Sequence, residues 1–287
     1  MDRDTQLKAK EIMRRYRAHK RASFAIVALD AVFLIYMVIF KWDYRMDAVM
    51  GGFASFMLII SVFVTYVAIV AVAVLVEMAG AIKIDSALYE QCDPFVYEAC
   101  LDGLRVFFYK DRVVCLHAMA QYYQGNSDRA EEILRSVNLY KLRGMFRLNY
   151  YILMSAICFQ KGMGMRASEL EQSFRNGIKK NKKAQRDFET LCASNNLIRA
   201  IENKDYPSAF RFLSERKGLD GAKCRKWTHI GYSLYEAEIY AGIGDKKSAR
   251  LNLEYVIAEG GRLVYVKRAK ELLREIEKTT DGESENG

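Results

Sequence analysis

Two long apolar runs near the start of the chain constrain its fold more than any other feature. Ser23–Phe40 holds 18 residues with one charged side chain, Asp30, and Ala48–Val76 holds 29 residues with none. A helix needs about 20 residues to cross the ~30 Å apolar core of a bilayer. Each run therefore predicts a membrane span, at about 23–40 and 51–77.

The charges on either side of these runs predict the orientation of the chain. Residues 1–22, a basic leader, carry eight Lys and Arg side chains, whereas the connector 41–47 carries two. Basic flanks stay on the cytoplasmic side. Two spans in a hairpin, residues 23–80, therefore predict an integral membrane protein with both termini in the cytoplasm. A cleaved signal peptide is the alternative for the first run. The long leader, Asp30 and the lack of a small-x-small cleavage pattern argue against it.

Asp30 needs a partner or a proton, because an acid in a span costs about 2.5 to 3.5 kcal/mol on insertion scales. Small or weakly polar residues recur at helical spacing along the second run, namely Ala54, Ser61, Thr65 and Ala68. Such stripes favour close helix contact. We expect this stripe to face the first helix, with the hydroxyl of Thr65 or Tyr66 bonded to Asp30. A proton or ion site and a contact with another membrane protein remain the alternatives.

The remainder of the chain predicts an all-α structure. Only two prolines occur, Pro94 and Pro207, and strand-like alternation is hard to find. The six cysteines form no C-x-x-C pair, and the three histidines are not clustered. Neither disulfides nor a metal site are therefore expected. No phosphate-binding glycine loop or nucleophile-base pattern is present, so we expect no cofactor and no enzymatic activity.

A helical hairpin recurs four times after the apolar runs. The clearest copies are Tyr235–Val256 and His117–Val137, and weaker copies cover 153–170 and 196–213. Each has an apolar helix with small residues, a short turn and a second helix that opens with alanine. The second-helix alanines are Ala130, Ala167, Ala209 and Ala249, at intervals of 37, 42 and 40 residues.

This pattern resembles the tetratricopeptide repeat (TPR) family, whose unit is a pair of antiparallel helices of about 34 residues. Gly125, Gly162 and Gly244 stand where a first helix would end in a left-handed cap, and Lys204 replaces the glycine in the third copy. The resemblance covers about 85–278. It implies a TPR-like α-hairpin solenoid over residues 81–278, which follows the two-helix transmembrane hairpin. The polar tail 279–287 is expected to be disordered.

The resemblance also implies a site, because arrays of this family bind proteins or peptides on the concave surface of their first helices. The residues expected in this apolar-aromatic groove are Met119, Tyr122, Tyr123, Phe159, Ile198, Ile201 and Glu238. The lysine and asparagine set that some relatives use for a terminal carboxylate is not apparent. The leading hypothesis is a membrane-tethered adaptor or scaffold for a protein or peptide partner in the cytoplasm. Packing between repeats is the alternative role for each side chain.

Two other functions remain as alternatives. A basic cluster, Lys179, Lys180, Lys182, Lys183 and Arg186, is suited to anionic lipid or RNA, although a solvated turn between repeats is the favoured explanation and nucleic acid is not the expected partner. Asp30 suggests a hairpin-mediated subunit of a membrane complex, a channel or transport accessory, or a homo-oligomer formed through the hairpin.

Overall fold

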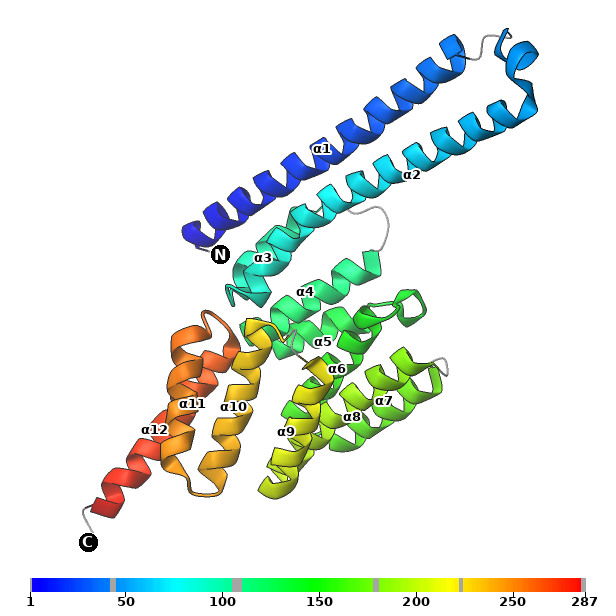
Figure 1. The fold of residues 1–287 in the computed structure, drawn as a ribbon. Helices are drawn as coiled ribbons and strands as arrows, with labels where there is room; N and C mark the ends of the chain where they lie inside the picture. The colour runs from blue at the N-terminus through cyan, green and yellow to red at the C-terminus, as the bar shows by residue number, and fades with distance from the viewer. Residues whose placement is uncertain (1, 42–44, 105–109, 178–180, 222–223, 285–287) are drawn as a thin grey trace. The chain divides into compact units, whose positions relative to one another are not determined.

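The computed structural model describes the backbone of residues 2–41, 45–104, 110–177, 181–221 and 224–284, and their side chains except at 37–41, 45–59 and 279–284. All regular secondary structure in these ranges is helical, which confirms the all-α prediction (Figure 1). The chain divides into two compact units, 2–86 and essentially 87–287. Each unit is described by itself.

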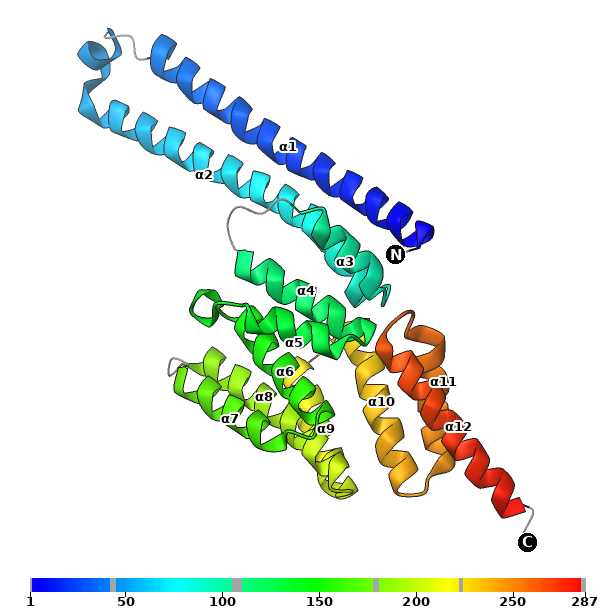
Figure 2. The same ribbon diagram turned by 180° about the vertical axis from the view of Figure 1, so that it is seen from behind.

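The first unit is a hairpin of two long helices. α1 (Arg3–Lys41) and most of α2 (Arg45–Tyr89) run side by side in opposite directions (Figures 1 and 2). One described helical stretch, Ile60–Tyr89, is long and apolar enough to cross a membrane, with a mean hydropathy of 2.5 and 6% of its most apolar window buried. The predicted spans 23–40 and 51–77 each include residues whose side chains lie outside the described ranges.

A line of shielded residues on each helix marks the contact between α1 and α2. In α1 these residues recur every three or four positions, as Tyr16, His19, Ser23, Ile26, Asp30 and Leu34. In α2 they include Ala73 and Gly80. A Cβ atom at Gly80 would lie 3.0 Å from the His19 Cβ and 3.2 Å from the Tyr16 Cδ2. The absence of a side chain at Gly80 therefore lets the two backbones approach closely.

The second unit is an array of helical hairpins. It contains α3 (Pro94–Asp102), α4 (Lys110–Gln124), α5 (Ser127–Arg135), the 3-10 helix η1 (Leu139–Lys141), α6 (Met145–Gln160), α7 (Gly164–Gly177), α8 (Lys182–Glu202), α9 (Tyr206–Asp220), α10 (Lys226–Gly242), α11 (Lys246–Glu259) and α12 (Val264–Ser284). α4 packs on α5, α6 on α7, α8 on α9 and α10 on α11. The first helices also pack on one another, as α4 on α6 and α6 on α8.

The turn within each hairpin has the same geometry. One or two residues after the first helix ends, φ is positive, at Gly125 (92°), Gly162 (68°), Lys204 (58°) and Gly244 (86°). The next amide donates to the carbonyl five residues back, with N···O distances of 2.8 to 2.9 Å in all four turns. This is the left-handed cap that the glycines predict. The third hairpin forms it with a lysine, although a side chain in this conformation costs about 1 to 2 kcal/mol.

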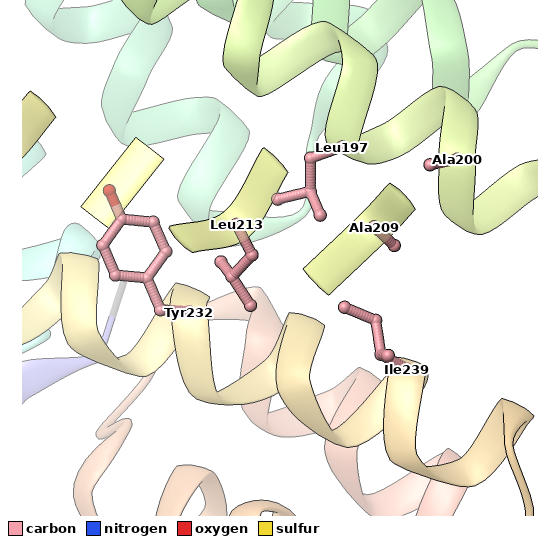
Figure 3. Close-up of a cluster of buried hydrophobic side chains, with 6 residues drawn as sticks. All are labelled: Leu197, Ala200, Ala209, Leu213, Tyr232 and Ile239. Carbon is pink, nitrogen blue, oxygen red and sulfur yellow. The ribbon is translucent and has the colours of Figure 1, made fainter. Parts of the chain in front are cut away.

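The second-helix alanines lie in the core of the hairpins. Ala130, Ala167, Ala209 and Ala249 are all fully buried. Figure 3 shows Ala209 and Leu213 of α9 between α8, which supplies Leu197 and Ala200, and α10, which supplies Tyr232 and Ile239. A methyl group at the crossing lets two helices pack without a void, and neighbouring hairpins then share one core.

The end of the array returns to its beginning. α12 packs on α4 as well as on α10 and α11. The Arg262 amide donates to the Cys92 carbonyl at 2.9 Å, and the Arg262 guanidinium lies 3.5 Å from the Asp93 carboxylate and 4.2 Å from the centre of the Phe95 ring. The repeat unit is therefore closed on itself between the turn before α3 and the turn before α12.

The C-terminal segment differs from its expected disorder. α12 extends to Ser284, so residues 279–284, assigned to a disordered tail from their polarity, are helical. The preceding turns consist of good helix formers, and each further residue adds one hydrogen bond to a helix that already exists. Residues 285–287 lie outside the described part of the chain.

Candidate functional site: an aromatic cavity in the repeat array

A cavity of about 500 Å³ lies inside the closed array. Its walls come mainly from the first helices α4, α6, α8 and α10, with contributions from the end of α9 and the start of α12. On α6, Leu148, Ile152 and Ala156 line it at helical spacing. The cavity therefore lies on the side of the array that the first helices of the hairpins face.

One part of the cavity is aromatic. The Trp227 ring lies 4.7 Å from the Tyr123 ring, nearly edge-on, and 5.4 Å from the Tyr89 ring, measured between centroids. Tyr123 also meets Tyr122 at 5.3 Å and Tyr265 at 5.8 Å, both edge-on. Edge-to-face pairs are worth about 0.5 to 1.5 kcal/mol beyond the area they bury, so this wall is a rigid apolar surface.

The hydroxyl groups in the aromatic wall are neutral donors. Burial raises the pKa of Tyr122 to about 12 and the pKa values of Tyr123, Tyr235 and Tyr265 well above the usual range. Phenols with such pKa values stay protonated near neutral pH. This wall can therefore bind apolar and hydrogen-bonding groups of a ligand without any charge of its own.

Another part of the cavity lining is polar and charged. Arg216 pairs with Asp220, whose carboxylate also accepts the hydroxyl proton of Tyr232, and the Arg216 Nε donates to the Ser194 hydroxyl at 2.9 Å. The Arg225 guanidinium is exposed and lies 4.0 Å from the centre of the Tyr89 ring. The cavity thus has an aromatic wall, with the exposed Arg225 cation beside it, and a separate polar group of residues around Arg216 and Asp220.

The expected groove residues divide into two groups. Met119, Tyr122, Tyr123 and Ile198 line the cavity. Phe159 packs against Cys158 and Ala167 with the Arg199 guanidinium 5.5 Å from its ring centre, and Ile201 packs on the cluster of Figure 3. The Glu238 carboxylate accepts from Arg268 at 3.2 Å, between α10 and α12. These last three are not among the described residues that line the cavity.

Several cavity residues have no counterpart in the sequence analysis. Trp227, Tyr232 and Tyr235 lie on α10, whose start at Lys226 precedes the start of the fourth copy as read from the sequence. Tyr265 lies on α12, beyond the fourth copy of the helical hairpin. The aromatic spacing of Trp227 and Tyr235 was the available signal for α10. Tyr265 gave none, because only closure of the array brings it inside.

The polar residues of the hairpin are not arranged as expected. Asp30 is 3% exposed, and neither of its carboxylate oxygens has a hydrogen-bond partner among the described residues. The Thr65 hydroxyl donates to the Ser61 carbonyl of its own helix at 2.9 Å, and Thr65 and Tyr66 are both exposed. The predicted bond from Thr65 or Tyr66 to Asp30 is therefore wrong.

The predicted stripe of small residues on α2 also points away from α1. Ser61, Thr65 and Ala68 are exposed, and the Ala54 side chain lies outside the described residues. The contact with α1 is made instead along the line of Ala73 and Gly80. His19 of α1 lies against Gly80 of α2. Because the helices are antiparallel, Asp30, which is 11 residues after His19, is level with Ile69, which is 11 residues before Gly80. A threonine that bonds to its own helix needs no interhelical partner, so it can face outward.

The basic cluster is only partly described. Lys179 and Lys180 lie outside the described residues, while Lys182, Lys183 and Arg186 are exposed in the first turns of α8. Arg186 lines the cavity and donates to the Leu219 carbonyl. The cluster thus borders the cavity through Arg186.

The cysteines are free thiols of low reactivity. Burial raises the pKa of Cys100 and Cys115 to about 12 and that of Cys92 and Cys192 to about 11. The thiolate is the nucleophile and the metal ligand, so such thiols react poorly near neutral pH. Within the described residues, no His, Cys, Asp and Glu side chains gather into a group that could hold a metal ion.

Comparisons with known proteins give no relative from which a function could be transferred. No protein-family model, no curated protein and no solved structure matches this chain. The function is therefore inferred from the chain's own residues and geometry.

Proposed function

We propose that this chain is a membrane-tethered adaptor whose TPR-like array binds a peptide segment of a protein partner in the central cavity. The observation that carries the proposal is the cavity of about 500 Å³, with its aromatic wall and the polar residues around Arg216 and Asp220. Ligand sites are typically concave and mostly apolar, with a few polar groups that fix orientation. An apolar side chain of the partner would occupy the aromatic wall, and a polar or acidic group would meet Arg225.

Membrane attachment is the second part of this proposal. The stretch Ile60–Tyr89 supports one span. The antiparallel partner α1 carries large exposed apolar side chains, including Phe24, Leu29 and Phe33, which water would not favour. We infer a two-span hairpin whose termini both lie in the cytoplasm, because the basic leader favours that side. The repeat array would then stay close to the inner leaflet.

The test places a photo-crosslinking amino acid in the cavity of the full-length protein in its membrane. Ile152 is suitable because it is half-buried and lines the cavity on α6. Leu251, exposed on α11, is the matched position outside the cavity. Ala156→Trp, one turn from Ile152, fills the cavity without removing a side chain from the aromatic wall. Far-ultraviolet circular dichroism and thermal unfolding check that the array remains folded in this variant.

We expect the same crosslinked partner from Ile152 in repeated preparations, no such product from Leu251, and at least a tenfold loss with Ala156→Trp. A crosslink that persists in a folded Ala156→Trp protein would show that the partner does not occupy the cavity. The double variant Tyr122→Ala/Tyr123→Ala is less informative, because both rings are buried and their removal costs about 3 to 5 kcal/mol per ring.

A second candidate function, a hairpin-mediated subunit of a membrane complex, is supported by Asp30. An uncompensated buried carboxylate costs several kcal/mol, which a basic or donor group from another subunit or a second copy would offset. In-membrane crosslinking of wild type against Asp30→Leu tests this. Loss of a crosslinked complex while the protein remains inserted supports assembly through Asp30, and an unchanged complex refutes it.

A further inference from the structure

A second surface feature lies at the loop between α5 and α6. Tyr140 is 97% exposed, and Met145, at the start of α6, is 63% exposed. The loop itself is ordered by hydrogen bonds: the Tyr140 amide donates to the Asn138 side chain at 3.1 Å, and the Asn138 amide donates to the Asp111 carboxylate at 3.0 Å. Leu142 is buried beneath it. The ring of Tyr140 is thus held in solvent by a fixed backbone.

Positive charge surrounds this ring. Lys141 and Arg143 are exposed in the loop, and residues 136–147 contain no acidic side chain. Lys183 reaches the loop from α8, because its Nζ lies 4.0 Å from the position of a Cβ at Gly144. Lys182 is exposed beside Lys183 in the first turn of α8.

The start of α6, which follows this loop, is also tied to the end of α7. The Arg147 Nη1 donates to the Gly177 carbonyl at 2.8 Å, which ties the start of α6 to the end of α7, close to the α8 cluster. The acids beside these cations are Asp111, which is mostly shielded and lies 3.8 Å from Lys141, and Asp187, which interacts electrostatically with Lys183. Lys141, Arg143, Lys182 and Lys183 outnumber these acids, so the surface keeps a net positive charge.

We propose that Tyr140, Lys141, Arg143, Met145, Lys182 and Lys183 form a membrane-docking surface that holds the repeat array against anionic lipid headgroups. A tyrosine ring favours the headgroup zone because its body is apolar and its tip is polar, and basic side chains near it attract anionic lipid. Single-stranded nucleic acid is a weaker fit, because its bases stack on successive aromatic rings and this surface offers one. The docking rests on the membrane attachment proposed above and not on the cavity.

The test uses the full-length protein in lipid nanodiscs, with benzoylphenylalanine in place of Tyr140. Discs of phosphatidylcholine alone are compared with discs that also contain phosphatidylserine, and lipid adducts are measured by mass spectrometry. The matched position is Tyr255, exposed on α11. The test variant is Lys182→Glu/Lys183→Glu, and the control variant of equal charge is Lys267→Glu/Lys270→Glu on the exposed side of α12.

We expect lipid adducts at position 140 in the anionic discs, few in the neutral discs and few at position 255. The Lys182→Glu/Lys183→Glu variant should lower adduct formation at least about fivefold, the factor for one basic side chain near an anionic surface, and high salt should act in the same direction. The α12 control variant should leave it unchanged.

Equal adduct yields in both kinds of disc, equal yields at positions 140 and 255, or crosslinks to RNA or protein in place of lipid would each overturn the docking surface. Alkaline extraction separates this from a failure of membrane attachment. A protein that resists extraction but forms no lipid adduct at position 140 retains its hairpin and refutes only the docking.

Discussion

Closure of the repeat array can be broken at Gly261, which precedes α12 with a φ of 55°. A Cβ at this position would lie 2.8 Å from the Cys92 carbonyl oxygen and 2.9 Å from the Gln91 carbonyl oxygen. Both are backbone atoms, so neither can turn aside as a flexible side chain would. Gly261→Ala therefore adds a steric clash to the cost of a left-handed alanine. Gly244→Ala is the matched control, because its φ is 86° and nothing lies within 4 Å of the added methyl group.

The two costs can be separated. A left-handed alanine costs about 1 to 2 kcal/mol, while the stiffer unfolded chain returns about 0.4 to 1 kcal/mol. Gly244→Ala should then lower the free energy of unfolding by about 1 kcal/mol. Overpacking adds about 1 to 3 kcal/mol, so Gly261→Ala should lower it by about 3 kcal/mol.

The assay is urea unfolding of the full-length protein in detergent micelles, followed by the fluorescence of Trp227 in the cavity wall, with Trp42→Phe as the common background. With a slope of about 2 kcal/mol per molar urea, we expect midpoints lower by about 0.5 M for Gly244→Ala and about 1.5 M for Gly261→Ala. Amide hydrogen exchange at Arg262, whose N–H bonds to Cys92, should accelerate only in Gly261→Ala. Equal midpoint shifts with unchanged exchange would refute closure through this contact.

Three further predictions concern the repeat unit. Lys204→Gly should raise the free energy of unfolding by about 0.5 kcal/mol, because glycine relieves the left-handed strain but makes the unfolded chain more flexible; urea unfolding with Lys204→Ala as the neutral control checks it. Hydrogen bonding to Lys161 and the pairing with Arg135 lower the pKa of Glu131. The stability that the ionised Glu131 contributes is therefore fully present above its unfolded pKa, ordinarily about 4.5, and is lost as the pH falls through the lower folded pKa. In thermal unfolding between pH 7 and pH 3, the melting temperature of Glu131→Gln should fall less than that of wild type. Asn195→Ala should lower the free energy of unfolding, measured in urea, by about 2 kcal/mol, because the buried Asn195 side-chain amide donates to the Glu171 carboxylate at 2.6 Å. Glu171→Gln, which keeps a carbonyl acceptor, should lower the free energy of unfolding by less.

The turns and helix crossings of the hairpins were predictable because they depend on single residues and their immediate neighbours. A left-handed cap needs glycine or a tolerated substitute, and a helix crossing needs a small side chain. Gly125 and Gly244 therefore indicate a helix end, and Ala249 indicates a helix crossing, from residue type alone. The structure gives each of them that role. The third hairpin forms the same left-handed turn at Lys204, although the glycine that would predict it is missing, because the surrounding hairpin imposes the turn on the lysine.

The contact face of the hairpin was not predictable from residue type alone. Threonine and alanine both favour helix contact and tolerate lipid, so the line through Thr65 and Ala68 was as plausible as the line through Ala73 and Gly80. The two lines differ by one residue along α2, a rotation of about 100° about the helix axis. Register between two nearly uniform apolar helices is set by the whole interface, in which Gly80 gives the closest approach.

The cavity was predictable only as far as the first helices of the repeats. Helical periodicity places Met119 and Tyr123 on the inner face, but it cannot tell a wall from a filled core, and Phe159 on the equivalent helix is packed away. What decides this is α12. Its Val264 would lie 3.0 Å from a Cβ at Gly125, and its Tyr265 would lie 3.2 Å from one at Gly231.

The packing of α12 against α10 leaves one trace in the sequence, the glycine at position 231. A glycine within α10 costs about 1 kcal/mol of helix stability relative to alanine, so its position calls for a reason in packing. The reason is the Tyr265 ring, which lies against the backbone of α10 and turns its edge toward Tyr123. The cavity wall therefore depends on a contact between α10 and the helix that closes the array. A partner that enters the cavity would meet a surface assembled from both ends of the repeat unit, so loss of closure should weaken binding as well as stability.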